Sequence, residues 1–455
     1  MKDTSVKNST IDYYDIGDYL KREEKLNRLA GFEDLDSVQF KTITPNAKGD
    51  WINQREDAFD KLIPLKRDKK LKIFNTIFDL NSNGVATNRD HWVYNFSPKI
   101  LTQSVQKCID TYNADLKRFN ECFREAFKQR AKGVKPGDLY KQLNDKEITT
   151  DKTKIAWTDG LKNKLINNKN LQESRSARLA LYRPFNKQWL YWDRDLINRQ
   201  RKFSKIFPNK HAQNVVINTS SMASRNFSCL IANEITDVQT MANNQAYPLY
   251  YYDDLGNRYN AISGWALNLF RKHYGDNSIT EEEIFYYIYA ILHHKGYLEK
   301  YKNSLKKEDP CTALSPDFKE LSVLGKQLAE LHLNYESGEM HESVKHTTLM
   351  NAEEKGYYDV VQMKKDKKGD CIIYNHNIAI TKIPQKAFEY VVNGKSAIDW
   401  VIECYQKTMD KESLIENNPN DYAGGKYVFE LLCRVIKLSE KSVDLIEKIS
   451  MKRFE

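Results

Sequence analysis

The sequence lacks the features that would place it in a membrane or outside the cell. Its first residues, MKDTSVKNST, contain no apolar signal core, and no stretch approaches the roughly 20 apolar residues that span a bilayer. The seven cysteines are scattered, odd in number and form no CxxC pair. These absences predict a soluble cytoplasmic protein without a membrane partner.

The sequence also lacks a complete nucleotide-binding or methyltransferase motif. Residues 394–396 (Gly-Lys-Ser) imitate the end of a phosphate-binding loop, but Glu389 stands where that loop needs a glycine. Residues 418–422 (Asn-Pro-Asn-Asp-Tyr) miss the second proline of the loop with which amino-methyltransferases hold a flipped adenine. No glycine-rich strand-to-helix turn precedes them, so both segments are interpreted as turns.

Metal-binding and nuclease signatures are equally incomplete. His293 and His294 are adjacent on a predicted helix, where their side chains point about 100° apart and cannot share one metal. Residues 317–319 (Asp-Phe-Lys) are too short a fragment to identify a nuclease. We therefore assign no catalytic or metal-binding residue to this chain.

The composition predicts a folded, basic protein. Hydrophobic residues make up 40% of the 455 residues and aromatic residues 12%, which excludes a disordered chain. This length suits two or three domains. The net charge of +9 and the pI of about 8.8 favour a polyanionic partner without identifying it.

The first part of the chain is expected to be mainly helical. A short strand is predicted at 11–14 and a helix from there through Leu29. Ser97 and Pro98 form an N-cap and a first-turn proline, and apolar residues then recur every three or four positions. They predict one long connector or core helix that ends near Gln129.

The later part mixes strands and helices. Short β-rich runs occupy 178–254, the residues 253–257 suit a hairpin turn, and Thr280 with Glu283 has the spacing of a capping box for a helix through about Leu305. The remaining expectations are a polar loop at 337–355, a hairpin of 357–363 and 371–380 around the turn 364–370, and helices at 396–405 and 426–449 with a candidate break near Ser439. The fold class is therefore α+β: a helical connector, then a β-rich domain with helical insertions and a helical C-terminus.

The basic segment, residues 198–211 (NRQRKFSKIFPNKH), has the strongest local positive charge. It contains Arg199, Arg201, Lys202, Lys205 and Lys210 but no acid. Phosphate contacts need positive charge that no neighbouring carboxylate neutralises. The segment predicts a DNA-binding surface, and the alternative is a solvated surface turn.

Uncharged polar residues follow the basic segment. Arg can form two hydrogen bonds with guanine, and Asn or Gln can do the same with adenine in the major groove. The candidate base-reading residues are Arg225, Asn226, Gln239, Asn243 and Asn244. The same residue types are common in loops, which is the alternative interpretation.

A third candidate surface precedes the long helix. Trp92, Tyr94 and Phe96 alternate as in a half-buried strand, and Asn88 and Arg89 lie on the turn before it. We expect this turn to face DNA, with Arg89 exposed and Trp92 buried.

Six long stretches occur in the order found in one bacterial family. They are YYDIGDYLKREEKL (13–26), GVATNRDHWVYNFS (84–97), YRPFNKQWLYWD (182–193), EIFYYIYAILHHKGYLEKY (283–301), GKQLAELHLNYE (325–336) and YVVNGKSAIDWVIECYQ (390–406), and ENNPNDY (416–422) continues them. In these stretches the chain resembles the C-terminal part of type ISP restriction-modification enzymes. Those enzymes join a nuclease, a helicase-like translocase, an adenine methyltransferase and a target-recognition domain. The sequence departs at 309–312 (Asp-Pro-Cys-Thr), where relatives tend to show a Pro-Arg-Ile-Pro type run whose arginine has no counterpart here.

The resemblance implies a target-recognition role in double-stranded DNA binding. Residues 1–175 would be the trailing edge of a methyltransferase and a helical connector. Residues 176–455 would be the target-recognition domain, β-rich at 176–275, helical at 276–336, with a hairpin and helices at 337–455. The methyltransferase, helicase and nuclease modules would lie in cis or in a partner subunit. S-adenosylmethionine, ATP and Mg²⁺ would serve those modules, and no cofactor is expected in this chain.

Two other functions remain open at this point. One is a non-catalytic scaffold subunit of a defence complex that binds nucleic acid without sequence preference. The other is an enzyme with an unrecognised nuclease or methyltransferase site. Selection of one motif from random duplexes distinguishes a sequence reader from a scaffold.

Overall fold

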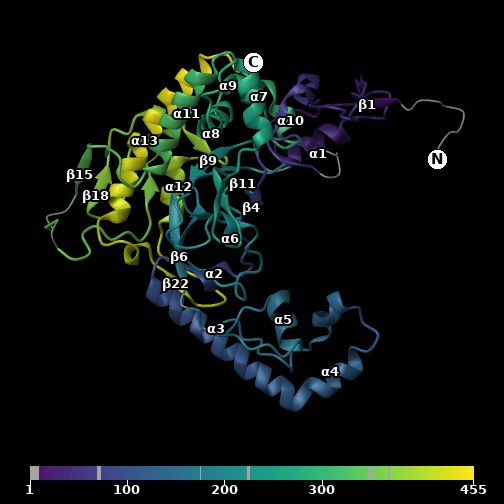
Figure 1. Ribbon diagram of the computed structural model, residues 1–455, viewed down its shortest axis with the longest axis vertical. Helices are drawn as coiled ribbons and strands as arrows, with labels where there is room; N and C mark the ends of the chain where they lie inside the picture. Colours follow the sequence, from purple (N-terminus) through teal and green to yellow (C-terminus); the bar gives the residue numbers. More distant parts are fainter. Residues whose placement is uncertain are drawn as a thin grey trace, which may run out of the picture. The chain divides into compact units, whose positions relative to one another are not determined.

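The computed structural model describes residues 10–68, 73–174, 176–222, 226–347, 351–352, 354–366 and 369–455. The chain divides into a small compact unit that ends at Lys61 and a large one from Leu62 to Glu455. Helices and several small sheets are mixed, so the fold is α+β as predicted (Figure 1). Among the described residues, no helix is both long and apolar enough to cross a membrane.

The small unit consists of a two-stranded sheet and one helix. Strand β1 (Ile11–Tyr13) pairs antiparallel with β2 (Lys41–Ile43). Helix α1 (Arg22–Ala30) begins later than the sequence predicts and contains no buried residue. The delay has a local cause, because Gly17 adopts a left-handed φ of 99° before the helix. The first strand thus pairs within its own unit.

Two four-stranded sheets form the middle of the large unit. The first has the order β10 (Ile235–Thr236), β6 (Ala177–Arg183), β7 (Asn186–Tyr191), β5 (Tyr94–Asn95), and only its β10–β6 pair is parallel. The second has the order β4 (Ser82–Asn83), β11 (Gln245–Pro248), β8 (Val216–Thr219), β9 (Cys229–Ala232), all antiparallel. The predicted turn at 253–257 is confirmed, since it joins β12 (Tyr250–Tyr252) to β13 (Arg258–Asn260).

A helical arm, residues 98–171, is inserted before β6. It contains α3 (Pro98–Arg118), a π-helical turn (Phe119–Phe123), α4 (Arg124–Arg130), a 3₁₀ helix (Pro136–Gln142) and α5 (Asp159–Ile166). The predicted cap is confirmed, because the Ser97 hydroxyl accepts a hydrogen bond from the Ile100 amide. Tyr112 and Asn113 of α3 bond main-chain groups of 169 and 171, which fastens the second half of the arm to the first.

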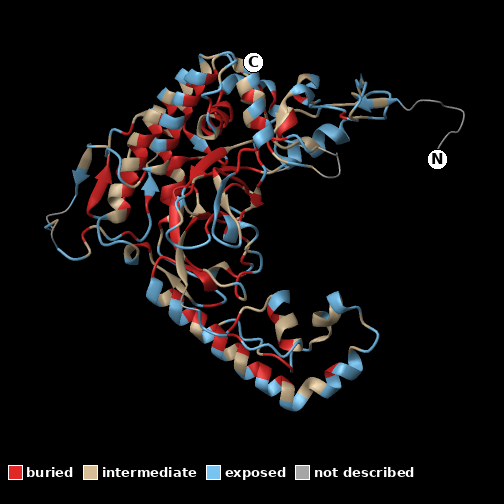
Figure 2. Cartoon of the chain, in the orientation of Figure 1, coloured by how far each residue is buried: buried red, intermediate tan, exposed pale blue. Residues whose placement is uncertain are grey.

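Helices cover the second sheet. Helix α8 (Glu281–Ile291) has the predicted capping box but ends before Leu305, and the short helices α9 (Lys295–Lys300) and α10 (Lys302–Leu305) follow it. Helix α11 (Phe318–Leu333) packs closely on α8 at Gly325, where a Cβ would lie 2.0 Å from the Tyr286 main-chain oxygen. Helix α7 is Gly264–Tyr274. Buried residues of this layer appear red in Figure 2.

The C-terminal region adds a sheet and two helices. The sheet has the order β15 (Val344–His346), β18 (Ile378–Ile380), β17 (Ile372–Ile373), β16 (Lys364–Lys365). Two of its strands, β15 and β16, lie where a loop and a turn were expected. The predicted hairpin is wrong in its bounds, because 357–363 contain no strand and the predicted strand 371–380 is divided into β17 and β18. Helix α12 is Ala397–Cys404. Helix α13 (Tyr427–Ser450) has no break at Ser439, because that buried hydroxyl bonds the Val435 carbonyl one turn earlier.

Short pairs complete the fold: β3 (Ile63–Pro64) with β14 (Cys311–Thr312), β19 (Val391–Val392) with β20 (Lys395–Ser396), and β21 (Thr408–Met409) with β22 (Glu416–Asn417).

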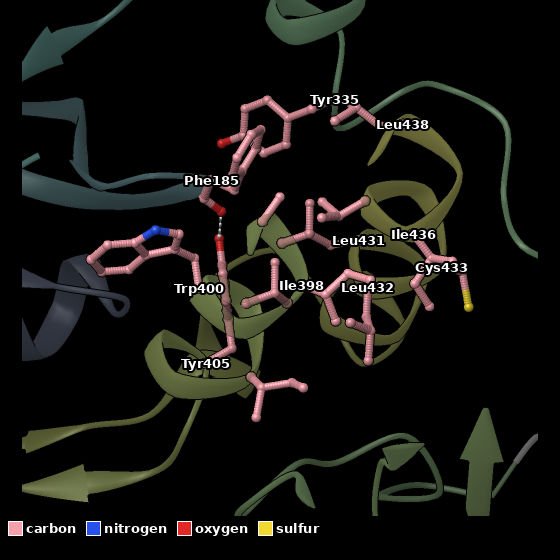
Figure 3. Close-up of a cluster of buried hydrophobic side chains, with 14 of the residues drawn as sticks. Phe185, Tyr335, Ile398, Trp400, Tyr405, Leu431, Leu432, Cys433, Ile436 and Leu438 are labelled. Carbon is pink, nitrogen blue, oxygen red and sulfur yellow. Dashed lines mark hydrogen bonds between the residues drawn. The ribbon is translucent and has the colours of Figure 1, made fainter. Parts of the chain in front are cut away.

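One apolar core joins the C-terminal helices to the β-rich region. In Figure 3, Leu431 and Leu432 of α13 and Ile398 of α12 face the same interior as Phe185, which lies in the β6–β7 connection. The Tyr405 hydroxyl donates to the Phe185 carbonyl oxygen at 3.2 Å. A second core runs from the arm into the first sheet and includes residues on both sides of position 175.

Candidate nucleic-acid interface

The candidate DNA-contacting segments leave one edge of the second sheet. Asn83, Gln245, Thr219 and Cys229 form a row across its four strands. Three connections leave this row: residues 84–90, residues 220–228, and residues 237–244, which we call the polar turn. Their backbones are tied together, since the Gly84 amide bonds the carbonyl of Asn244 and the Ser221 amide bonds that of Ala242. The fold therefore gathers segments that are far apart in the sequence.

The first connection and the polar turn approach each other very closely. Val85 forms a parallel bridge with Asp237, and the Val238 amide bonds the Val85 carbonyl at 2.8 Å. A Cβ at Gly84 would lie 2.5 Å from the main-chain oxygen of Asp237. Only glycine fits at this position without displacing the polar turn.

The basic segment joins the same edge. Ala86 and Arg199 exchange two main-chain hydrogen bonds, of 2.8 and 3.1 Å, and the Lys202 amide bonds the Ser82 hydroxyl. Backbone pairing thus places the predicted phosphate-binding residues beside the Asn88 turn.

The cations of the basic segment are exposed. Arg199, Arg201, Lys202 and Lys205 all face solvent, and Lys205 also lies 3.6 Å from the exposed carboxylate of Asp254. Helix α6 (Phe203–Ile206) anchors the segment through the buried side chains of its first and last residues. Partial burial and the adjacent Arg199 charge lower the pKa of Arg201. Such crowding of positive charge is relieved when an anion binds.

Four of the polar candidates are also exposed. Asn88, Asn226, Gln239 and Asn243 face solvent. Asn88 and Asn243 have left-handed φ angles of 55° and 62°, which Asn tolerates better than most residues. A further candidate, Arg225, lies outside the described residues.

Asn244 is buried, which corrects its predicted place at the surface. Its Nδ2 donates to Asn218 Oδ1 and to Thr236 Oγ1, both at 2.8 Å. The Thr236 hydroxyl in turn donates to Asn218 Oδ1 at 2.9 Å. Asn244 therefore fixes the end of the polar turn against the sheet.

Arg89 is also buried, contrary to the prediction that it faces DNA. Its Nη2 donates to the Thr158 hydroxyl at 2.6 Å, and Thr158 caps α5 of the arm. Burial lowers the pKa of Arg89. Only 5% of the residue is exposed, so Asn88 points outward while Arg89 connects the turn to the arm.

The predicted half-buried strand at 92–96 is largely wrong. Residues Asp90–Val93 form the helical turn α2, and only Tyr94–Asn95 are a strand, β5. Trp92, Tyr94 and Phe96 are buried as expected, but so are Val93 and Asn95 between them. The residues between the aromatic side chains are buried as well, so the alternation does not mark a strand with one exposed face.

A partly buried charge network beneath these turns was not predicted. Arg183 Nη1 lies 3.0 Å from Asp237 Oδ1, and Arg183 Nη2 lies 3.9 Å from Asp90 Oδ2. Tyr94 donates to Asp237 at 3.3 Å, and Tyr182 donates to Asp90 at 2.9 Å. One guanidinium thus connects the turn at 87–90 with the polar turn.

The network positions both turns from below. Asp237 Oδ1 accepts a hydrogen bond from the Gln239 amide at 2.8 Å, and Asp90 accepts one from the Thr87 hydroxyl. Burial, together with the Asp90 charge, raises the pKa of Asp237 to about 7, although Arg183 opposes the shift. Hydrogen bonds thus connect both turns, which carry the exposed side chains of Asn88 and Gln239, to this network.

A pocket of about 800 Å³ opens beside the two turns. Its wall includes residues 86–92, residues 237–239, and Trp157 and Lys162 of the arm. Several acids also line it: Asp90, Asp145, Asp237, Asp410 and Glu412. These carboxylates disfavour a phosphate inside the pocket, so phosphates are better matched to the basic segment. In the part of the chain that the structure describes, no group of three or more His, Cys, Asp or Glu side chains is placed to hold a metal ion.

Comparison with known proteins gives one family and several DNA-bound structures. Residues 76–431 match the model of the Type ISP C-terminal specificity domain. No curated protein matches the chain.

Three solved structures are similar over nearly the whole chain. A nuclease-deletion mutant of the Type ISP enzyme LlaGI, in complex with a DNA substrate mimic, is 33% identical with a TM-score of 0.85, covering 99% of this chain and 40% of that one. The ATP-dependent Type ISP enzyme LlaBIII bound to DNA is 32% identical with a TM-score of 0.83, covering 98% and 28%. A DrdV–DNA complex is 27% identical with a TM-score of 0.80, covering 97% and 43%. This chain spans less than half the length of each, and it belongs to the family of Type ISP C-terminal specificity domains.

Proposed function

We propose that this chain recognises a specific, asymmetric double-stranded DNA site for a Type ISP restriction-modification enzyme. The observation that carries the proposal is the family match over residues 76–431. It agrees with the basic segment, whose exposed cations lie on the same sheet edge as the exposed amides. DNA binding in the relatives LlaGI and LlaBIII supports it further.

Catalysis belongs to other modules in this proposal. The chain presents the adenine of its site to a methyltransferase, and a translocase and a nuclease act in cis or in a partner subunit. S-adenosylmethionine, ATP and Mg²⁺ serve those modules. Residues 1–175 act as the trailing edge of the methyltransferase and connector, and 176–455 as the recognition domain.

The two kinds of exposed residue have different roles. The first kind contacts phosphates and therefore strengthens binding to every DNA sequence equally: Arg199, Arg201, Lys202 and Lys205. Asn226, Gln239 and Asn243 are the remaining described candidates for base contacts, and Arg225, the residue before Asn226 in the sequence, is a further candidate. A good two-bond contact discriminates between bases by about 1–3 kcal/mol.

Selection of bound sequences from a random duplex pool tests the proposal. Enrichment of one motif supports it, whereas salt-sensitive binding without enrichment supports a scaffold. Replacing Arg199, Arg201, Lys202 and Lys205 together with Ala should weaken binding to all duplexes. The salt dependence should also flatten, by up to about 0.9 log units for each phosphate that the variant no longer neutralises. If the variant kept the wild-type DNA affinity and salt dependence, the basic segment would be a solvated surface turn that does not contact DNA.

A charge-matched control separates local contacts from net charge. The control replaces four exposed lysines, Lys272, Lys302, Lys306 and Lys448. No carboxylate among the described residues lies within ion-pair distance of these four side chains. Their joint replacement with Ala should leave the salt slope near that of the wild type.

A further inference from the structure

Most of the net charge of the chain lies in the helical arm. Residues 98–171 contain 16 Lys and Arg against 9 Asp and Glu, which gives +7 of the total +9. All of these residues are described by the structure. The basic segment is therefore not the main source of positive charge in this protein.

Several acids of the arm are used internally. The buried Asp115 accepts hydrogen bonds from the Thr149 amide at 2.6 Å and from its hydroxyl at 2.9 Å, and it pairs with Arg118. The buried Glu147 pairs with Arg130 at 2.7 Å. These carboxylates hold 144–149 against α3 and α4, so they do not shield the outer lysines.

Eight lysines of the arm have no carboxylate within 4.0 Å, in a segment whose residues are all described. Seven are exposed and Lys162 is half-buried. The eight are Lys99, Lys107, Lys117, Lys132, Lys135, Lys146, Lys162 and Lys169, whereas the other cations of the arm pair with acids or, for Arg124, bond carbonyl oxygens.

Three of these lysines lie along one side of α3. The apolar stripe, which includes Leu101 and Leu116, is buried, and Lys99, Lys107 and Lys117 lie on the opposite, exposed side. Figure 2 shows buried and exposed residues on different sides of this helix. At 1.5 Å per residue the row is roughly 27 Å long. One strand of B-DNA presents a phosphate about every 3.4 Å along its axis, so the row matches about eight base-pair steps.

We propose that this lysine-bearing side of the arm is a second phosphate-binding surface, which holds duplex DNA next to the recognised site. The proposal rests on the proposed function and extends it to a different part of the chain. The arm contributes affinity and salt dependence, whereas the loop edge supplies sequence preference. Lysine suits this role because its ammonium group contacts phosphate as a point charge, and phosphate contacts carry no sequence information.

The test replaces Lys99, Lys107 and Lys117 together with Gln, which keeps a similar helix propensity in α3. Binding to random-sequence duplex DNA is measured by fluorescence anisotropy across a salt series. We expect weaker binding to every duplex and a salt slope reduced by up to about 0.9 for each lysine that meets a phosphate. The motif selected from a random pool should stay unchanged.

The matched control is the triple replacement of Lys272, Lys302 and Lys306 with Gln, three exposed lysines outside the arm. Equal reductions in affinity and slope in both triple variants would overturn the proposal, because net charge alone would explain them. A wild-type slope in the folded arm variant would also overturn it. The proposed function is tested separately by the wild-type chain. If the wild type selects one motif from the random pool, the proposed function stands even when the arm proposal fails; if it selects none, the proposed function itself is rejected.

Combining the arm triple variant with the quadruple variant of the basic segment gives a second readout. Two surfaces that contact different phosphates should reduce the salt slope additively. A combined variant no different from the quadruple variant alone would show that the arm contacts no phosphates of its own.

Discussion

The basic segment and the polar turn occupy the same edge of the fold but place their side chains differently. The four cations at 199–205 are all exposed. In the polar turn Gln239 and Asn243 are exposed, whereas Asp237 and Asn244 are buried. An unpaired charge is far more costly to bury than an amide that finds partners. These four cations of the basic segment are exposed as predicted, whereas the buried Arg89 and Asn244 show that neither a positive charge nor an amide group alone decides exposure.

The largest effect expected at this edge concerns the residues that support it. Trp92→Ala removes a large aromatic side chain that is 4% exposed, and it should lower the free energy of unfolding by about 3–5 kcal/mol. Urea denaturation measures the change. If the free energy of unfolding fell by less than about 1 kcal/mol, the side chains around α2 would have repacked into the space left by the indole ring.

Arg89 and Asn88 are adjacent but should respond differently. Arg89→Ala leaves Thr158 without its buried donor and should cost about 1–3 kcal/mol of stability. Asn88→Gly keeps the left-handed backbone and removes only an exposed side chain, so stability should change by less than about 0.5 kcal/mol. Similar decreases in stability in the two variants would contradict the inward and outward orientations.

Asn244 and Asn243 form a second such pair. Asn244→Ala deprives Asn218 and Thr236 of a buried partner and should cost about 1–2 kcal/mol. Asn243→Gly preserves φ and should leave thermal stability nearly unchanged while altering preference at one position of the DNA site. Binding to a library of single-base site variants measures that preference. A wild-type profile for Asn243→Gly would remove it from the base-reading candidates.

Local signals in the sequence predicted the parts of the fold that local interactions determine. Ser97 with Pro98, and Thr280 with Glu283, begin helices as expected because each cap involves residues three positions apart. The strand predicted through Trp92 was wrong because the alternation of aromatic residues does not show whether the residues between them are also buried.

The charge network could not be derived from local patterns. Arg183 meets Asp90 and Asp237, which are distant in sequence, and nothing near any of the three marks the others as partners. The only available signal was the family resemblance, since two of its stretches, 84–97 and 182–193, contain Asp90 and Arg183. Asn243 and Asn244 are the same residue type, yet only Asn244 lies where its side chain can bond Asn218 and Thr236, so their different exposure could not be predicted from residue type.

A pH dependence of stability is expected beneath the polar turn. Asp237 faces Asp90 of α2, Tyr94 of β5, and Tyr182 and Arg183 of β6, and burial raises its pKa to about 7. An unfolded Asp has a pKa of about 3.9. Between these values the folded state binds more protons than the unfolded state, so the contribution of Asp237 to stability is full below about pH 4 and is lost as the pH rises towards 7. Asp237→Asn imitates the neutral acid and should remove this decline. Urea denaturation of both proteins at several pH values should therefore give a wild-type-minus-variant difference that falls between pH 4 and 7 and is level above it. Gln239→Ala is the control, because it retains the main-chain amide that donates to Asp237 and should keep the wild-type profile. Parallel profiles for the wild type and Asp237→Asn would show that the carboxylate stays charged in the folded protein, with Arg183 outweighing the effect of burial.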